Sequence, residues 1–408
     1  MEIHNTGITA TQPPITVHTK RALGLIFSIM LMDIVGLSVL SPVAPYIVRR
    51  YSSDALMVTM VTVIYAAAQF FAAPLMGKLG DRYGRRPVLL VSLIGQAAGY
   101  LLFGVGGALW ILLVGRLIGG ITGGNLSTAT AYIADVSKPE ERAKNFTLIG
   151  MAWGLGLILG PALGSVFGQF GLEAPAFAAA VLSMINVLLG IFLLPESLPV
   201  AERETTPMHG RDFNPLASIA DMARKPGLGM LLVVACLFQF ALNGIGSTNV
   251  LFLIAKFSAQ PWQVGSLLVL GGVSLAVVQF VLIQRLVPRL GSQRIAVASL
   301  VGQAGAWLAV FFAPVLWLIY PIYMFGSAMS GFTWPTMTTL LANRVPHREV
   351  GLLMGVSTGL GSLMNIAGPL WAGVAFDAVM PGAAHWMGAF VFVAAALLLM
   401  RQKDIKPV

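Results

Sequence analysis

Long runs of apolar residues recur along the chain, separated by short polar segments. The runs are continuous rather than alternating, and each is close to the roughly 20 residues that an α-helix needs to cross the hydrocarbon core of a bilayer. A helix satisfies its own backbone hydrogen bonds in lipid, whereas an open strand does not. The pattern predicts an all-α membrane protein with twelve spans, at residues 22–43, 56–77, 87–106, 109–134, 144–168, 175–194, 227–252, 262–286, 294–313, 315–341, 350–374 and 384–400.

Composition supports lipid as the solvent. Of the 408 residues, 57% are hydrophobic and 10% are charged, whereas a soluble domain carries about 25% charged residues. The single cysteine, Cys236, lies in an apolar run, so an internal disulfide and a cysteine-based metal or redox motif are excluded. We expect it to be a small buried hydrophobe. No metal and no cofactor are predicted.

The positive charges alternate between the loops, which predicts the orientation. If the N-terminus is cytoplasmic, the inner segments hold 21 of the 25 lysines and arginines, as the positive-inside rule requires. A nucleic-acid binder would not divide its charge in this way, although the net charge is +9. The polar residues 1–19 and the long first apolar run do not resemble a signal peptide. Both termini are predicted to be cytoplasmic, with the bacterial inner membrane as the location.

The chain repeats itself at an offset of about 208 residues. The segment GPALGSV at 160–166 matches GPLWAGV at 368–374, Asp135 aligns with Asn343, and Gln69 aligns with Gln279. Two parallel repeats place a substrate site at their interface near the membrane midplane. The predicted organisation is a tail at 1–21, a six-helix bundle at 22–194, a linker at 195–226, a second bundle at 227–400 and a tail at 401–408. Within the linker, Asn214–Lys225 is either a surface helix or plain connection.

The loop after the second span reads GKLGDRYGRRP at 77–87. Its glycines permit a tight turn and close packing, Asp81 can cap a helix or pair with an arginine, and the arginines anchor the inner face. The loop resembles the signature loop of the major facilitator superfamily. That resemblance implies two pseudo-symmetric six-helix bundles and a gating role for these residues and for Asp135. The expected gating residues here are Gly77, Asp81, Arg82, Gly84, Arg85, Arg86 and Asp135.

Two further helices carry signals of transport. Arg116 lies inside the fourth span, where a charge is expensive unless it faces water or a partner; it either faces the cavity or extends toward the interface. In the fifth span Gly156, Gly160 and Gly164 share one face, so that another helix can approach closely, and Pro161 bends the helix there. This stretch resembles the antiporter motif of facilitator-type exporters, which implies a bending seam.

Asp33 is the one carboxylate deep inside a predicted span. Low dielectric disfavours the charged form of a carboxyl group, so Asp33 is the candidate proton carrier, with Arg116 as its partner. A static ion pair between the two residues is the alternative.

Together these stretches resemble the tetracycline/proton antiporters of the twelve-helix drug:proton antiporter family. The similarity is dense from about 30 to 200, including DRYGRRPVLLVSL, GRLIGGITGGN and AYIADV. Those exporters carry an aspartate in helix 3, where this chain has Gly99 and Tyr100, and a histidine in helix 8, which this chain lacks. Coupling through Asp33 alone is therefore expected, and a metal–tetracycline substrate is not.

Amides are the main remaining polar groups in the spans, and each either lines the cavity or bonds between helices. Gln96, Asn186, Asn249 and Gln303 are among them. Asn243 lies near the repeat position of Asp33, which predicts an uncharged binding partner in the second half. The predicted substrate-binding set is Tyr65, Gln69, Asn125, Gln239, Phe240, Asn243, Gln279, Trp334 and Asn365. Aromatic and amide groups suit an amphipathic organic solute.

The sequence thus predicts a monomeric exporter that exchanges a small amphipathic organic compound or drug for protons by alternating access. The alternatives are export of a physiological solute, such as a sugar, siderophore or metabolite, and a non-transporting sensor or membrane enzyme. An enzyme is disfavoured because no histidine lies deep in a predicted span and no cysteine or carboxylate pair is found there.

Overall fold

A computed structural model of the chain describes residues 17–138, 140–204, 228–346 and 349–402. Within these ranges the regular structure is entirely helical, and eleven helices are long and apolar enough to cross a membrane. The twelve long segments are α1 Val17–Val39, α3 Ala55–Tyr83, α4 Arg85–Val105, α5 Leu109–Thr122 continued by α6 Asn125–Val136, α7 Arg142–Phe167, α8 Ala174–Phe192, α10 Leu228–Phe257, α11 Pro261–Val277 continued by η4 Val278–Leu282 and α12 Ile283–Leu290, α13 Ser292–Phe312, α14 Leu316–Ala342, α15 Val350–Ala378 and α16 Ala383–Met400.

Each of the twelve predicted spans overlaps one of these segments, so the predicted fold class is confirmed. The span predicted at 109–134 is interrupted at Gly123 and Gly124, between α5 and α6. The span predicted at 262–286 contains the π-helical turn η4. Three short elements lie outside the spans, namely α2 Ala44–Val48, η1 Gly168–Phe170 and η2 Val200–Glu202. The possible surface helix at Asn214–Lys225 lies outside the described residues.

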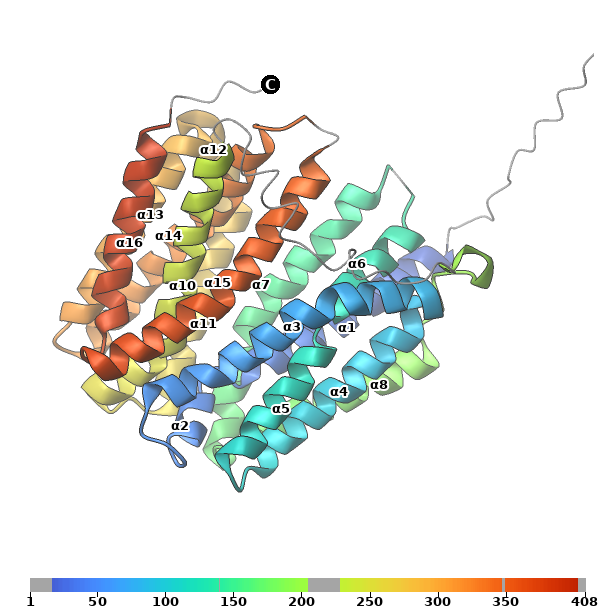
Figure 1. Cartoon of the computed structure of the whole chain (residues 1–408), viewed down its shortest axis with the longest axis horizontal. Coiled ribbons are helices and arrows are strands. Elements are labelled where there is room, and N and C mark those ends of the chain that lie inside the picture. The colour runs from blue at the N-terminus through green and yellow to red at the C-terminus, as the bar shows by residue number, and fades with distance from the viewer. Residues whose placement is uncertain (1–16, 139, 205–227, 347–348, 403–408) are drawn as a thin grey trace, which may run out of the picture.

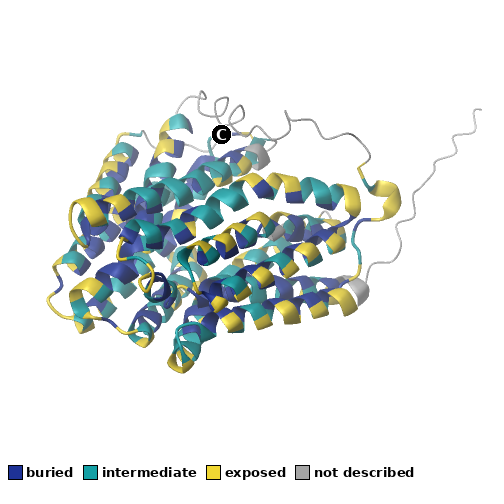
Figure 2. Cartoon of the chain, turned by 60° about the horizontal axis from the view of Figure 1, so that its bottom comes forward, coloured by how far each residue is buried: buried dark blue, intermediate teal, exposed yellow. Residues whose placement is uncertain are grey.

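The helices form two groups, one from each half of the chain (Figure 1). In the first, α1 packs on α7 and α8, and α4 packs on α5 and α8; in the second, α10 packs on α15 and α16, and α13 packs on α14 and α16. Large apolar side chains, among them Phe71, Trp110, Phe170 and Phe192, are exposed on the outside of the helices, as the exposed outer faces in Figure 2 show. A surface of this kind is stable in lipid rather than in water.

The two halves repeat one another in detail. Gly84, before α4, and Gly291, before α13, both adopt positive φ, at 105° and 81°. A Cβ on Gly95 would meet Thr122, and a Cβ on Gly302, 207 residues later, would meet Met329, the equivalent of Thr122. The crossing of α4 with α5 is thus reproduced by α13 with α14. The starts of α3 and α11, however, place Gln279 about one turn beyond the equivalent of Gln69.

The halves meet near one end of the bundle, which we call the far end because α1 begins and α16 ends at the other, the terminus side. The contacts run between α3 and α15 and between α7 and α11. The Asp377 carboxylate of α15 accepts hydrogen bonds from the Ala55 and Leu56 amides, both at 2.9 Å, and Tyr46 donates to the Ala259 carbonyl. In Figure 1 the two groups diverge from the far end toward the terminus side.

Candidate functional site

A polar cluster lies inside the first half between α3, α4 and α5, which pack on one another, and the Tyr100 side chain reaches from it to α1. A narrow crevice there is lined by Tyr65, Gln96, Gly99, Tyr100, Gly115, Arg116 and Gly119. Gln96 Nε2 donates to the Tyr65 hydroxyl at 3.2 Å. The Tyr65 and Tyr100 phenols lie within electrostatic range of both Asp33 and Arg116. The structure therefore brings the two ionisable groups of the sequence prediction into one cluster, with two phenols and an amide around them.

Arg116 is buried in this cluster and does not extend to the interface. It lies seven residues into α5, about 10 Å from the helix start at 1.5 Å per residue, and its residue is 8% exposed. Its guanidinium stacks on the Phe103 ring at 4.7 Å from the centroid, an attraction that partly compensates the burial of a cation. Its Nε has no hydrogen-bond partner among the described residues. The sequence left open whether Arg116 faces the interior or extends toward the membrane interface, and the structure places it in the interior.

Tyr100 reaches the cluster through a close approach to α1. A Cβ on Gly36 would lie 3.4 Å from the Tyr100 ring, and Gly36 is one turn from Asp33, so the phenol packs on the face of α1 that carries the carboxylate. The Tyr100 hydroxyl is buried with no hydrogen-bond partner in the described ranges. The sequence left Gln96 open between a place in the cavity and a bond between helices, and it did not predict Tyr100 as a cluster residue. Their four-residue spacing on one helical face was the available signal.

The missing aspartate of helix 3 has a steric explanation. A Cβ on Gly99 would lie 2.6 Å from the carbonyl oxygen of Gly115, and a Cβ on Gly115 would lie 2.7 Å from that of Gly99. These are backbone contacts that no side-chain rotation relieves, so α4 and α5 cross too closely for any side chain at position 99. The polar group on this face is instead Gln96, one turn earlier.

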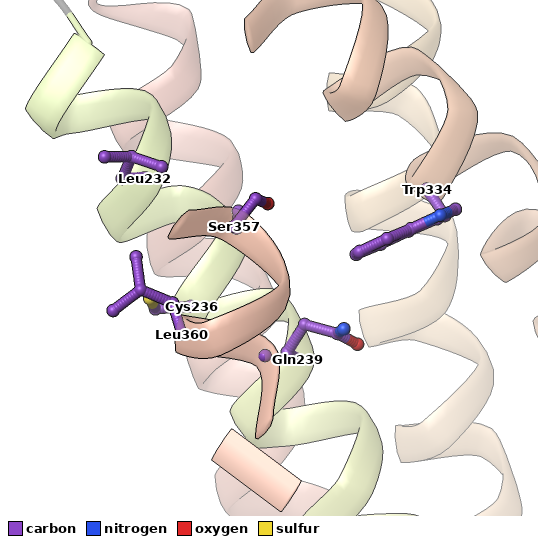
Figure 3. A pocket seen from close by; sticks show the side chains of 8 residues that line it. Leu232, Cys236, Gln239, Trp334, Ser357 and Leu360 are labelled. Atoms are coloured by element: carbon purple, nitrogen blue, oxygen red, sulfur yellow. The ribbon is translucent and has the colours of Figure 1, made fainter. Parts of the chain in front are cut away.

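In the second half, a pocket is lined by side chains from α10, α14 and α15. Figure 3 shows Gln239 and Trp334 directed toward the same space, with Ser357 nearby. Two of the predicted binding residues, Gln239 and Trp334, are therefore brought together, and Trp334 is 42% exposed. Cys236 lines the same pocket and is only partly buried, so the expectation of a buried hydrophobe holds in part.

Other predicted binding residues are engaged within the protein. Gln69 Nε2 donates to the Gly123 carbonyl at 2.7 Å, a group released by the break between α5 and α6. Asn243 Nδ2 donates to the Gln239 carbonyl at 2.8 Å, and Phe240 stacks on Trp371 at 4.9 Å between ring centroids. Gln279 lies in η4 and Asn365 in α15, both half-buried. Asn125 begins α6, and its side chain is outside the described part.

The structure does not make Asn243 the equivalent of Asp33 in the repeat, as the sequence predicted, but places that equivalent at a neighbouring residue. A Cβ on Gly160 would meet Ser38 of α1, whereas a Cβ on the equivalent Gly368 would meet the Phe240 carbonyl and the Gly244 amide of α10. These crossings place the equivalent of Asp33 about one turn before Asn243, near Gln239. An uncharged amide still occupies the matching place, but it is the one in the pocket.

The segment predicted as a loop at 77–87 is helical in the structure, with only Gly84 between α3 and α4. Its charged residues form a network at the terminus side of the first half. Arg85 contacts Asp81 at 2.6 Å and Asp135 at 3.1 Å, and the Arg86 guanidinium donates to the Gly190 and Ile191 carbonyls. Glu196, which sequence reasoning missed, accepts from the Arg85 amide at 2.8 Å and so caps α4. Gly84, at φ 105°, leaves room for this carboxylate. Gly77 and Arg82 lie in the same segment of α3, with the Arg82 guanidinium 5.9 Å from the Tyr83 ring centroid.

The glycine stripe of α7 packs on α1, as predicted. A Cβ on Gly156, Gly160 or Gly164 would lie 2.5, 1.9 or 2.1 Å from Ile34, Ser38 or Val39. Pro161 is buried inside α7, and Ser38 Oγ accommodates the approach by donating to the Gly156 carbonyl at 2.9 Å.

One histidine is buried within a span. His385, in the first turn of α16, is 0% exposed and lies 3.2 Å from Asn249 Oδ1. It lies in the first turn, so it does not lie deep in the span, but its imidazole is buried beneath the Phe252 and Trp307 rings, which the sequence did not indicate.

Comparison with known proteins gives this geometry a context. The family model "Major Facilitator Superfamily" matches residues 26–369 and 231–407. The chain is 34% identical to tetracycline resistance protein class C of Escherichia coli over 385 residues, 94% of this chain and 96% of that protein. It is 27% identical to multidrug resistance protein 2 of Bacillus subtilis (strain 168), covering 86% and 89%.

A solved structure shows the same architecture. The human organic anion transporter MFSD10 superimposes with a TM-score of 0.70 at 26% identity, covering 95% of this chain and 100% of that one. The helical fold, the family model and relatives at this identity agree over almost the whole length, and they indicate a multi-pass membrane transporter rather than an enzyme. The chain therefore belongs to the Major Facilitator Superfamily.

Proposed function

We propose that the chain is a proton-coupled antiporter that exports a small amphipathic organic compound by alternating access. The observation that carries the proposal is the crevice around Arg116 and the Tyr65 and Tyr100 phenols, where Tyr100 packs on the face of α1 that carries Asp33. Ionisable groups inside a membrane span are costly and are retained where they carry protons or bind charged solutes. The similarity to tetracycline and multidrug resistance proteins supports export of drug-like compounds.

In this proposal Asp33 carries the proton, and Arg116 influences the equilibrium between its protonated and ionised forms. The Arg116 cation favours the carboxylate form of Asp33, whereas burial favours the neutral form. A change in solvation between the two access states then changes which effect dominates, so that Asp33 takes up a proton on one side and releases it on the other. The Phe103 ring holds the guanidinium in place throughout.

Alternating access would move the halves 22–194 and 227–400 about their contact. The far end, closed by Asp377 and by the packing of α3 on α15, is then the outer side, and the terminus side is cytoplasmic, in agreement with the loop charges. The tightly crossed α1 and α7 would form the seam on which bending occurs, and the Asp81–Arg85–Asp135 network would secure the inner side. The chain would act as a monomer.

The substrate would lie between the cluster and the pocket of the second half. Gln239, Trp334 and Ser357 offer an amide, an indole and a hydroxyl around an otherwise apolar lining, which suits an amphipathic molecule. A second candidate, export of an organic anion, is favoured by the unpartnered Arg116 Nε and by the similarity to MFSD10.

The test is efflux from everted membrane vesicles energised with a proton gradient. The panel holds a tetracycline, a lipophilic cation and an organic anion. Asp33→Asn is expected to reduce gradient-driven transport to the level of empty vesicles, while Asp54→Asn, an exposed carboxylate outside the cluster, leaves it intact. Unchanged efflux in Asp33→Asn would refute the coupling assignment, and the panel member that moves decides between the two substrate classes.

A further inference from the structure

The structure contains two equivalent buried glutamines in different surroundings. Gln96 of α4 and Gln303 of α13 are 207 residues apart, at matching places in the repeated helix crossing, and are 1% and 0% exposed. Each side-chain amide donates to a hydroxyl group: Gln96 to Tyr65 at 3.2 Å and Gln303 to Thr333 at 2.8 Å. Each leaves its Oε1 without a partner among the described residues. The two thus share a bond to a hydroxyl group and an unpartnered carbonyl, while Gln303 Nε2 also donates to the Ser299 carbonyl at 3.4 Å.

Their neighbours differ in charge. The crevice beside Gln96 holds Arg116 and Tyr100. The residues equivalent to these in the second half are Tyr323 and Trp307, whose rings pack edge to face at 5.8 Å. The second half therefore keeps the glutamine and an aromatic residue in the place of Tyr100, but a tyrosine replaces the cation.

The hydrogen-bond partners also differ in what they connect. Thr333 Oγ1 lies 2.8 Å from Ser299 Oγ as well as from Gln303, so this amide ties α13 to α14 within an uncharged network. Tyr65, in contrast, lines the same crevice as Arg116 and Tyr100, and its phenol lies within electrostatic range of Asp33. Because the phenol oxygen accepts from Gln96, the hydrogen of the phenol is left to point elsewhere in the cluster.

We propose that Gln96 is a positioning residue for proton coupling: it holds the Tyr65 hydroxyl in a fixed orientation toward the Asp33 and Arg116 cluster. The inference rests on the proposed function, since it assigns a role only if Asp33 carries the proton. Gln303 is the matched structural residue, with the same chemistry and burial but no coupling role. A buried side-chain amide whose carbonyl has no hydrogen-bond partner lowers stability. In the first half, the amide with this cost, Gln96, lies next to the charged residues of the cluster.

The groups that face Asp33 can be enumerated by helix. Tyr65 faces it from α3 and Tyr100 from α4, with Arg116 on α5 acting on both phenols. The helices packed on α1 are α7, α8 and α6. Ionisable side chains occur in α7 only in its first turn, and α8 has none. In α6 they are Tyr132 and Asp135, which bond to Pro195 and to Arg85 and Ser197. The hydrogen bond from Gln96 therefore ends on one of the two phenols that face Asp33.

The experiment compares Gln96→Met with Gln303→Met in the full chain. Methionine keeps the length and apolar volume of the side chain and removes the amide. The carboxyl band of Asp33 is assigned by infrared difference spectroscopy through its loss in Asp33→Asn, and its titration midpoint is measured in membranes without substrate. Efflux of the panel compound that responds is then measured against pH in everted vesicles.

Gln96→Met is expected to move the Asp33 midpoint by about half a pH unit or more and to move the pH profile of efflux with it. Tyr65→Phe should do the same, and the double variant should add little, because both changes break one hydrogen bond. Gln303→Met should leave the midpoint in place, even if it lowers thermal stability.

Three results separate the possibilities. If the Asp33 midpoint is equal in wild type, Gln96→Met and Gln303→Met while efflux remains proton-driven, the positioning role is wrong and the proposed function stands. If Gln303→Met moves the midpoint as far as Gln96→Met, the effect is general to the fold and the inference is again refuted. If the wild-type chain shows no proton-driven efflux of any panel compound, the proposed function fails first.

Discussion

The contact between Asp377 and α3 offers a direct test of how the far end is held closed. The carboxylate comes from α15 in the second half and accepts from the first two amides of α3 in the first half, both at 2.9 Å. These amides are among the four that a helix leaves without internal partners. Asp54, the residue before α3, makes no side-chain bond to them, so the cap is supplied across the interface. Asp377→Ala removes it.

The size of the effect follows from the chemistry of a helix cap. Loss of a capping side chain costs about 0.5–2 kcal/mol, and loss of a negative charge at the helix N-terminus costs a further 0.3–1 kcal/mol or so. The bond exists only when the far end is closed, so the whole loss of about 1–3 kcal/mol falls on that state. At roughly 1.4 kcal/mol per factor of ten, the ratio of open to closed far end should rise about 5- to 100-fold.

Labelling of a cysteine at position 59 reports this ratio. Thr59 is 0% exposed, and Gly373 of α15 packs against it, since a Cβ there would lie 2.4 Å from Thr59 Oγ1. The native cysteine is single, so Thr59→Cys in a Cys236→Ser chain gives one reporter. A membrane-impermeant maleimide added on the far-end side reacts only when α3 and α15 separate, and its rate measures the open population.

Asp54→Ala is the matched control, because it removes the same charge at the same helix end without breaking a cap. The reasoning would be refuted if Asp377→Ala and Asp54→Ala gave labelling rates within a factor of two of each other. An intermediate rate is expected for Asp377→Asn, which keeps one acceptor and loses the charge.

Two further predictions concern stability. Gly160→Ala, whose Cβ would lie 1.9 Å from Ser38 Oγ, should cost about 1–3 kcal/mol by overpacking and lower the Tm in detergent, and adding Ser38→Gly should recover part of the loss. Gly154→Ala, with nothing within 4 Å of its Cβ, is the control and should have no effect. Equal Tm values for the two alanine variants would contradict the packing argument. Glu196→Gln weakens the cap on the Arg85 and Arg86 amides and should destabilise the protein by about 1–2 kcal/mol. The measurement is its Tm relative to that of Glu202→Gln, a control at an exposed position. A Tm equal to that of the control would show that the cap contributes nothing.

Much of the fold was predictable because membrane spans are a local property. The free energy of transferring a run of side chains into lipid depends on that run alone, and so the twelve apolar segments anticipate the twelve long helical segments. The break at Gly123 and Gly124 was missed because glycines are common in membrane helices, and the bond from Gln69 to the Gly123 carbonyl released there joins residues 54 positions apart.

The candidate site was predictable only in its charged residues. Asp33 and Arg116 stand out because a charge in an apolar run is rare. Gln96 does not, since a lone amide in a span serves equally well between helices or in a cavity, and its twin Gln303 does the former. Asp377 and Glu196 were missed for another reason: their partners lie more than 300 and more than 100 residues away in the sequence.

The sequence by itself thus determined the number of spans, the charged residues enclosed in them, the repeat and, through it, the fold. Only the tertiary structure decided that Arg116 turns inward onto Phe103, that Tyr65, Tyr100 and Gln96 join it, and that Asp377 closes the far end. The physical reason is that hydrophobicity fixes which segments enter the lipid, whereas the rotation and crossing of each helix are set by packing against segments distant in the chain. In this protein those crossings depend on contacts such as Gly99 with Gly115 and Gly160 with Ser38, and they determine which polar groups meet.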